Sequence, residues 1–204
     1  MLALGLVALS ACDQRDGREM PPASPDQTAS VLTTTTAPAT TDRLVEPDSP
    51  ELSTLPAAGF GLQMPWIDDA DIPVDHTCKG TPTHDLAPRL TWTSVPAGTV
   101  ELAIVLTDQT ADGYVLWVMS GIDPNLGVVE AGVVPAGAVR ATNSTGALGY
   151  SGPCPPSGTH VYLAELFAIG QQLELSDGAL AVDAITAIET AAIDSATVSG
   201  IVAA

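Results

Sequence analysis

Short apolar runs separated by turn signals fill the chain from about residue 60 onward. Runs of this kind, rich in β-branched residues and bounded by Gly, Pro and Asp, are typical of strands. Their spacing predicts a mostly antiparallel β-protein. The expected strands are 61–64, 90–95, 101–108, 114–122 and 160–169.

The pattern changes near the C-terminus, where apolar residues recur at helical spacing between residues 178 and 193. Asp183, Glu189 and Asp194 lie off this stripe, as expected for a helix with one buried face. We predict one helix packed on the sheet, then a short strand over 197–202 that closes the sheet edge. The stripe consists of Leu180, Ala184, Ile185, Ile188, Ala191 and Ala192.

The first residues have the features of a sorting signal. Residues 1–11 are apolar and end in small residues, and Cys12 follows. This stretch resembles the signal peptide and lipobox of bacterial lipoproteins, which implies cleavage before Cys12 and attachment of a lipid to it. It lacks the Lys or Arg that normally precedes the apolar run, so the true start can lie upstream. The alternative is a buried apolar segment with a chance cysteine.

Residues 12–56 have the composition of a tether. The segment holds a Thr-rich run, several prolines and scattered acids, without lasting helical or strand periodicity. Such a sequence cannot bury enough surface to offset chain entropy. We expect a disordered stalk, or alternatively a Thr/Pro segment for glycosylation, that places a domain over 57–204 at the extracytoplasmic face of a membrane in a bacterial cell envelope.

The charge excludes some partners. The chain carries a formal net charge of −18, and residues 57–204 contain three basic and sixteen acidic residues. Nucleic acids and anionic bilayers are bound by clustered Lys or Arg, so we expect neither as a partner. Contact with a membrane is then expected through the lipid anchor only.

The most distinctive stretch is 149–160, which reads GYSGPCPPSGTH. Three prolines and three glycines cannot lie inside a helix or a central strand, and together they favour one fixed loop shape. The loop delivers His160 to the start of a strand. We interpret it as a device that positions an imidazole, with a tight turn carrying an incidental histidine as the alternative.

This loop and four other stretches resemble the phosphatidylethanolamine-binding-protein family, in its bacterial YbhB/YbcL-like, Raf-kinase-inhibitor-like group. Residues 149–162 are similar to the family signature G-Y-x-G-P-C-P-P-x-G-x-H-x-Y. The resemblance implies a two-sheet antiparallel β-sandwich with a C-terminal helix and a small anion pocket at one end. The other matching stretches are 72–80, 88–92, 95–99 and 143–146.

The family pocket binds phosphate-like or carboxylate groups through histidines, ordered acids and backbone N–H groups of rigid loops. A small anion or a phospholipid headgroup is therefore the expected ligand. By resemblance, the ligand-binding positions in this chain are Asp108, Tyr150, Gly152, Pro153 and His160, together with Thr110 and Leu116, which depart from the family residues.

Three positions depart from the family pattern. Thr110 replaces a second aspartate, Leu116 replaces a second pocket histidine, and Val161 replaces a basic residue. Losing one charge-assisted hydrogen bond costs about 1.5–3 kcal/mol. We expect a pocket retuned towards ligands with an apolar group, or alternatively a vestigial pocket.

Cys78 and Cys154 remain if Cys12 is lipidated. Two cysteines in an exported domain usually form a disulfide, and the alternative is a pair of buried thiols. His76, His84 and Asp85 are interpreted as a solvated loop, since no second cluster supports a metal site.

No catalytic motif is present, and Ser157 near His160 lacks an orienting acid in the sequence. We therefore expect a binding protein rather than an enzyme, with no cofactor and no metal. An alternative from another class is a protein-interaction or inhibitor module that binds an envelope protein while its pocket is vestigial.

Overall fold

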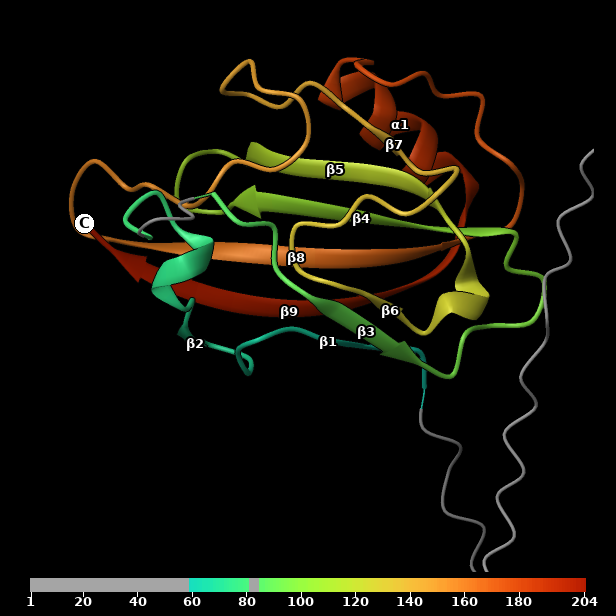
Figure 1. Ribbon diagram of the computed structural model, residues 1–204, viewed down its shortest axis with the longest axis horizontal. Coiled ribbons are helices and arrows are strands. Elements are labelled where there is room, and N and C mark those ends of the chain that lie inside the picture. The colour runs from blue at the N-terminus through green and yellow to red at the C-terminus, as the bar shows by residue number, and fades with distance from the viewer. Residues whose placement is uncertain (1–58, 81–84) are drawn as a thin grey trace, which may run out of the picture. The chain divides into compact units, whose positions relative to one another are not determined.

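The predicted strands form two sheets in the computed structural model, which describes residues 59–80 and 85–204. The smaller sheet has three strands in the order β1-β3-β6, and all of its pairs are antiparallel (Figure 1). These strands are β1 (Gly61–Gln63), β3 (Leu90–Thr93) and β6 (Val128–Val129).

The larger sheet has six strands in the order β2-β9-β8-β4-β5-β7. Its pairs are antiparallel except for β2 and β9, which run parallel. Two 3-10 helices, η1 (Val74–His76) and η2 (Pro124–Leu126), lie in the connections. The six strands are β2 (Ala70–Asp71), β4 (Glu101–Asp108), β5 (Tyr114–Ile122), β7 (Val139–Arg140), β8 (Thr159–Ile169) and β9 (Ala192–Ala203).

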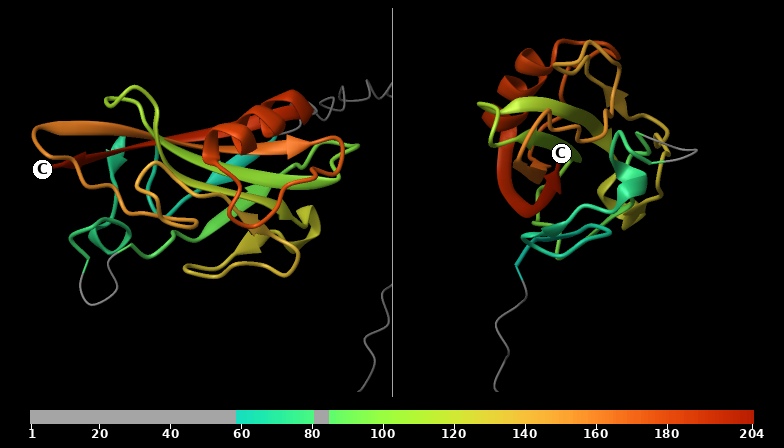
Figure 2. Two further views of the ribbon diagram at one scale, coloured as in Figure 1. Left: turned by 90° about the horizontal axis from the view of Figure 1, so that it is seen from above. Right: turned by 90° about the vertical axis from the view of Figure 1, so that its left-hand side faces the viewer.

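The central strand β4 is apolar on both faces because both faces are covered. Leu102, Ile104 and Leu106 point into the core between the two sheets, whereas Ala103 and Val105 point to the other face. There α1 (Ala181–Ala191) packs on the larger sheet (Figure 2). The sequence therefore reads as a continuous apolar run, as buried strands do.

The C-terminal helix is present but shorter than the predicted range 178–193. Its buried face consists of Ala181, Ala184, Ile188 and Ala191. Leu180 was wrongly assigned to the buried stripe, since it caps the helix N-terminus and is 59% exposed.

The last strand was predicted too short. β9 starts at Ala192, directly after the helix, and pairs with β8 along its whole length. It does not close the sheet edge, because β2 pairs with its outer side at Gly200 and Ile201. The pairing with β8 overrides the strong helical preference of the alanines at 192 and 196.

Candidate functional site

One end of the larger sheet brings together the residues that carry the resemblance. β4 ends at Asp108, β5 begins at Tyr114, and β8 begins just before His160. The register places Asp108 opposite both Tyr114 and Tyr162. A cavity of about 390 Å³, here called the His160 cavity, opens at this end. Its lining consists of Asp108, Ala111, Tyr114, Leu116, Thr145, Gly152, Cys154, Pro156, His160 and Tyr162.

His160 is held by Asp108. Its Nδ1 lies 2.6 Å from Asp108 Oδ2, and both side chains are largely buried. The other carboxylate oxygen, Oδ1, accepts the N–H groups of Thr110 (2.9 Å) and Ala111 (3.1 Å). This arrangement fixes the ring orientation and leaves Nε2 with no hydrogen bond from the described residues. Nε2 accepts a hydrogen bond when the ring is neutral and donates one when the ring is protonated.

Three N–H groups around the cavity are engaged within the protein. Gly152 N donates to Asp85 Oδ1 (2.6 Å), and Val161 N donates to Thr110 Oγ1 (3.0 Å). Ser151 N donates to the Leu116 carbonyl at 2.9 Å. Prolines 153, 155 and 156 have no N–H. These N–H groups are therefore not free to form the expected anion-binding nest. His160 Nε2 is the clearest polar contact for a ligand.

The walls of the His160 cavity are largely apolar and aromatic. Leu116, at the position of the missing second histidine, lines the cavity and is buried. Tyr162 lies at its floor, with its ring 6.3 Å from that of His160. Burial, followed by the negative charge of Asp108, raises the pKa of the Tyr162 phenol, so this hydroxyl stays neutral.

Thr110 and Pro153, two of the predicted ligand-binding positions, lie beside the cavity and do not line it. Thr110 ties the β4–β5 turn to β8 through its bond from Val161 N. Asp112, on the same turn, is exposed, has a φ of 49° and does not line the cavity. Pro153 is buried, and its carbonyl accepts the N–H of Cys78 at 3.2 Å. Pro153 thus shapes the loop.

A disulfide joins Cys78 to Cys154, with the two Cα atoms 5.4 Å apart. Beside it, Gly152 is packed so closely that a Cβ would lie 2.7 Å from the Thr77 carbonyl carbon and from Asp85 Oδ1. Only glycine fits at that point. The bridge and the close contact hold the proline loop against the segment after η1.

Asn143 organises the other side of the loop, a role that the sequence did not reveal. Its Nδ2 donates to the Leu116 and Gly149 carbonyls and to Ser151 Oγ, at 2.9–3.1 Å. Its Oδ1 accepts from the backbone and hydroxyl of Thr145. Asn143 is 5% exposed, so one buried amide fixes the segment that carries Thr145 to the cavity. In the sequence, the match of Asn143 to the family pattern was the feature that could have indicated this role.

Tyr150 was expected at the same rim as His160, but the structure places it elsewhere. It lines a second cavity of about 430 Å³ and packs edge-on against Trp117. Its hydroxyl donates to the His76 carbonyl at 2.5 Å, and burial raises the pKa of the phenol. Tyr150 is therefore a core contact in this protein.

The solvated loop expected at His76, His84 and Asp85 is only partly correct. His76 is buried, with Nδ1 2.8 Å from the Leu86 carbonyl, because η1 turns its ring inward. Asp85 is exposed as a residue but accepts the Gly152 N–H. His84 lies outside the described residues. The described ranges contain no cluster of three or more His, Cys, Asp or Glu suited to a metal.

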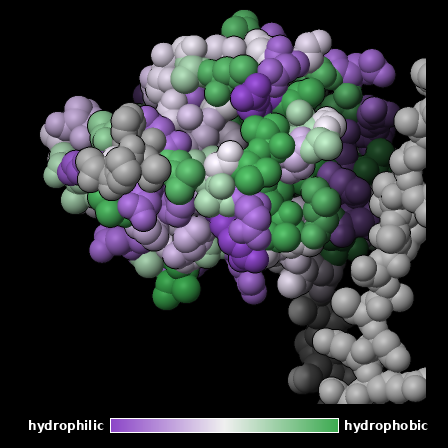
Figure 3. Space-filling view, viewed as in Figure 1, coloured by the Kyte–Doolittle hydropathy of each residue, from purple (hydrophilic) through white to green (hydrophobic). Residues whose placement is uncertain are grey.

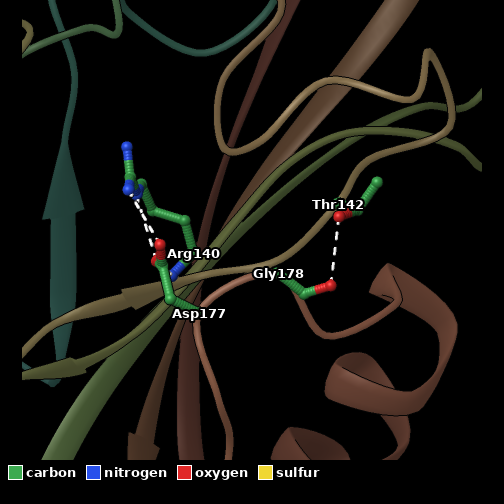
Figure 4. A network of polar contacts seen from close by, with 4 residues as sticks. All are labelled: Arg140, Thr142, Asp177 and Gly178. Carbon is green, nitrogen blue, oxygen red and sulfur yellow. Dashed lines mark hydrogen bonds and ion pairs between the residues drawn. The ribbon is translucent and has the colours of Figure 1, made fainter.

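The three basic residues of the described domain are already engaged. Arg140 forms a paired contact with Asp177, at 3.2 and 2.9 Å, and Thr142 Oγ1 donates to the Gly178 carbonyl nearby (Figure 4). Arg89 pairs with Glu130 at 3.2 Å. Lys79 Nζ donates to the Ala203 carbonyl at 3.1 Å. None of these cations lines the His160 cavity.

The C-terminus lies beside the site. Val202 pairs with His160 across the β8–β9 ladder, and Ala204 N donates to the Gly158 carbonyl at 2.8 Å. The end of the chain therefore supports the turn that leads into His160.

These features define a class: a two-sheet sandwich with a helix on its larger sheet and a histidine-bearing cavity at one end. A family model described as phosphatidylethanolamine-binding protein matches residues 64–203. The chain belongs to this family, as the loop signature predicted.

Individual relatives support this family assignment. A Mycobacterium tuberculosis protein named "Putative lipoprotein LppC" is 42% identical over 193 residues, covering 92% of this chain and 86% of that protein. A UPF0098 protein of Methanothermobacter thermautotrophicus is 38% identical over 129 residues, covering 60% of this chain and 83% of its own length. The crystal structure of E. coli YbcL, described as a new member of the mammalian PEBP family, has the same fold with a TM-score of 0.64 at 22% identity. That match covers 72% of this chain and 99% of YbcL.

Proposed function

We propose that this protein is a cell-envelope lipoprotein whose domain binds a small anionic or phospholipid-headgroup-like ligand in the His160 cavity. The observation that carries the proposal is the Asp108–His160 pair at the cavity, which leaves Nε2 without a protein partner among the described residues. We propose binding without catalysis: no hydrogen bond joins Ser157 to His160 in the part of the chain that the structure describes.

The ligand contact follows from the chemistry of the pair. When the ring is protonated, Asp108 accepts a hydrogen bond from Nδ1–H and Nε2–H donates to an anion oxygen. Leu116 and the aromatic walls favour a ligand that carries apolar groups beside its polar end. Because no cation lines the cavity, we expect affinity in the millimolar range, where one polar anchor typically places a small ligand.

NMR titration tests this function. We expect phosphoethanolamine, phosphate or acetate at millimolar concentration to shift the His160 ring signals, and His160→Ala to abolish thermal stabilisation by phosphoethanolamine. The matched control is Ser157→Ala, an exposed hydroxyl in the same loop, which should leave binding unchanged. No shift with any of the three ligands would remove the anion-binding proposal.

The lipid anchor is proposed from the lipobox at Cys12 and from the name of the mycobacterial relative. Cys12 lies outside the described residues, and the described ranges contain no helix suited to crossing a bilayer. The anchor would hold the domain at the extracytoplasmic face. We expect the protein made in a bacterial host to partition into detergent, and Cys12→Ala to remain in the aqueous phase; equal partitioning would contradict lipidation.

A protein-interaction role is the second candidate, and one surface favours it. Hydrophobic side chains gather on the face seen in Figure 3, and the second cavity is bordered by half-exposed Val133, Val134 and Leu148. Exposed apolar groups around a concavity are typical of contact sites. An envelope partner bound there should co-purify with His160→Ala and be lost from Val133→Asp; the opposite pattern would contradict this role.

A further inference from the structure

The Cys78–Cys154 disulfide lies near the protein surface and forms part of the His160 cavity. Cys154 is an exposed residue, and Cys78 is half-buried. Cys154 also lines the cavity, as Gly152 and Pro156 do. A thiol reductant can therefore reach the bridge in the folded protein. Any movement of Cys154 changes the wall of the ligand site.

The part of the proline loop that carries the bridge has few other restraints. Residues 154–157 form no hydrogen bond with other residues in the part of the chain that the structure describes. The nearest backbone hydrogen bonds lie on either side of them. The Pro153 carbonyl accepts the N–H of Cys78 at 3.2 Å, and the Gly158 carbonyl accepts the N–H of Ala204 at 2.8 Å. The disulfide is therefore the crosslink that fixes these four residues.

The surroundings of the bridge should keep the protein folded when the disulfide is open. Gly152 N still donates to Asp85 Oδ1 at 2.6 Å, and Pro155 is buried. His160 keeps its place on β8, which pairs with β9 along its whole length. Opening the bridge should thus loosen residues 154–157 and leave the larger sheet intact.

We propose that the Cys78–Cys154 disulfide is a redox switch for the His160 cavity, with strong ligand binding in the oxidised protein and weak binding in the reduced protein. This regulation rests on the ligand binding proposed above. The closed bridge holds Cys154 and Pro156 in one arrangement, so the cavity wall is formed before the ligand arrives. With the bridge open, the wall takes several arrangements. Affinity then falls by the fraction of time that the binding arrangement is populated.

The redox step needs a dithiol reductant at the envelope, either a small molecule or a protein. One thiolate of the reductant attacks a sulfur of the bridge, the S–S bond breaks, and the other sulfur leaves as a thiolate. The second thiol of the reductant then attacks the mixed disulfide and releases the first cysteine. Two electrons pass to the protein, two protons end on Cys78 and Cys154, and the reductant becomes a disulfide. An oxidising disulfide reverses the exchange.

NMR titration of the full chain with phosphoethanolamine, before and after treatment with dithiothreitol, tests the switch. We expect dithiothreitol to open the bridge without a change in the far-UV circular dichroism, and the affinity to fall about tenfold. Oxidised glutathione should restore it. The double variant Cys78→Ser, Cys154→Ser should bind as weakly as the reduced protein. This variant keeps Cys12, so its lack of response to dithiothreitol would assign the effect to the bridge.

Two results would overturn the switch: equal affinity of the oxidised and reduced proteins, or a bridge that opens only when the whole fold is lost. Failure of the proposed function looks different, because the oxidised protein would then bind neither phosphoethanolamine nor phosphate nor acetate. In that case the ¹⁵N relaxation of Ser157 and the ring signals of His160 decide whether the bridge shapes the cavity. Greater mobility of Ser157 with shifted His160 signals on reduction supports this control, and unchanged signals contradict it.

Discussion

At the scale of single residues, Asp108 determines what His160 can do. One carboxylate oxygen accepts two backbone N–H groups of the turn, and the other faces the imidazole at 2.6 Å. Both carboxylate oxygens of Asp108 thus already have hydrogen-bond partners. Asp108 therefore affects a ligand through the imidazole ring of His160. Its role is to hold Nδ1 and so to fix the orientation of the imidazole.

The variant Asp108→Asn tests this positioning role. The amide oxygen still accepts the two turn N–H groups, but the side chain loses the negative charge that faces Nδ1 of His160. We expect phosphoethanolamine affinity to fall about tenfold, in line with the loss of one charge-assisted bond. Ring ¹⁵N shifts of His160 should report a changed tautomer. Asp112→Asn, on the same turn, is the matched control and should leave both measurements unchanged; unchanged shifts in Asp108→Asn would contradict the role.

At the scale of elements, a crosslink between two loops stabilises the site. The Cys78–Cys154 bridge closes a loop of 76 residues and ties the proline loop to the segment after η1. In the chain-entropy account, a loop of this length contributes about 4 kcal/mol, because the bridge restricts the unfolded chain.

Removing both cysteines should therefore lower the free energy of unfolding by about 4 kcal/mol. Urea denaturation of the Cys78→Ser, Cys154→Ser double variant measures the loss. Wild-type protein under strong reductant should match the variant, and reductant should not affect the variant itself. Equal stability of the oxidised wild type and the variant would show that packing alone holds the loops.

The sequence predicted elements where a strong local pattern exists. β4, β5 and β8 were found because long apolar runs bounded by turns are typical of buried strands. The two-residue strands β2, β6 and β7 were missed because such short segments carry no periodicity. β9 was found, but its start was predicted five residues too late because alanines between helix and strand suit both, and only pairing with β8 decides between them.

The candidate site, too, was predicted in part and missed in part. Asp108, Leu116, Gly152 and His160 meet at one cavity, as the family resemblance implied. Tyr150 does not, because its neighbour Ser151 is held by the Leu116 carbonyl and the phenol turns to His76.

At the scale of the whole molecule, charge opposes the proposed ligand. The domain over 57–204 carries sixteen acidic and three basic residues, and all three cations are engaged with acids or a carbonyl. The field of the protein therefore repels an approaching anion, and only local contacts in the His160 cavity favour it.

Added salt usually weakens the binding of an anion to a protein, but at this site we expect it to strengthen the binding. Raising NaCl from 10 to 150 mM screens the repulsion, so we expect phosphate dianion to bind more tightly, and acetate to gain less because it carries less charge. NMR titrations at the two salt concentrations measure both ligands. A fall in phosphate affinity with added salt would show that attraction to cations dominates the site.

The hydrogen bond from Ala204 to Gly158 has a practical consequence for handling this protein. An affinity tag fused after Ala204 would be attached directly to the turn that leads into His160. We expect such a fusion to disturb this turn and to change the measured ligand affinity. A tag placed upstream of the domain avoids this, and comparing the two fusions would show how strongly the chain end supports the imidazole.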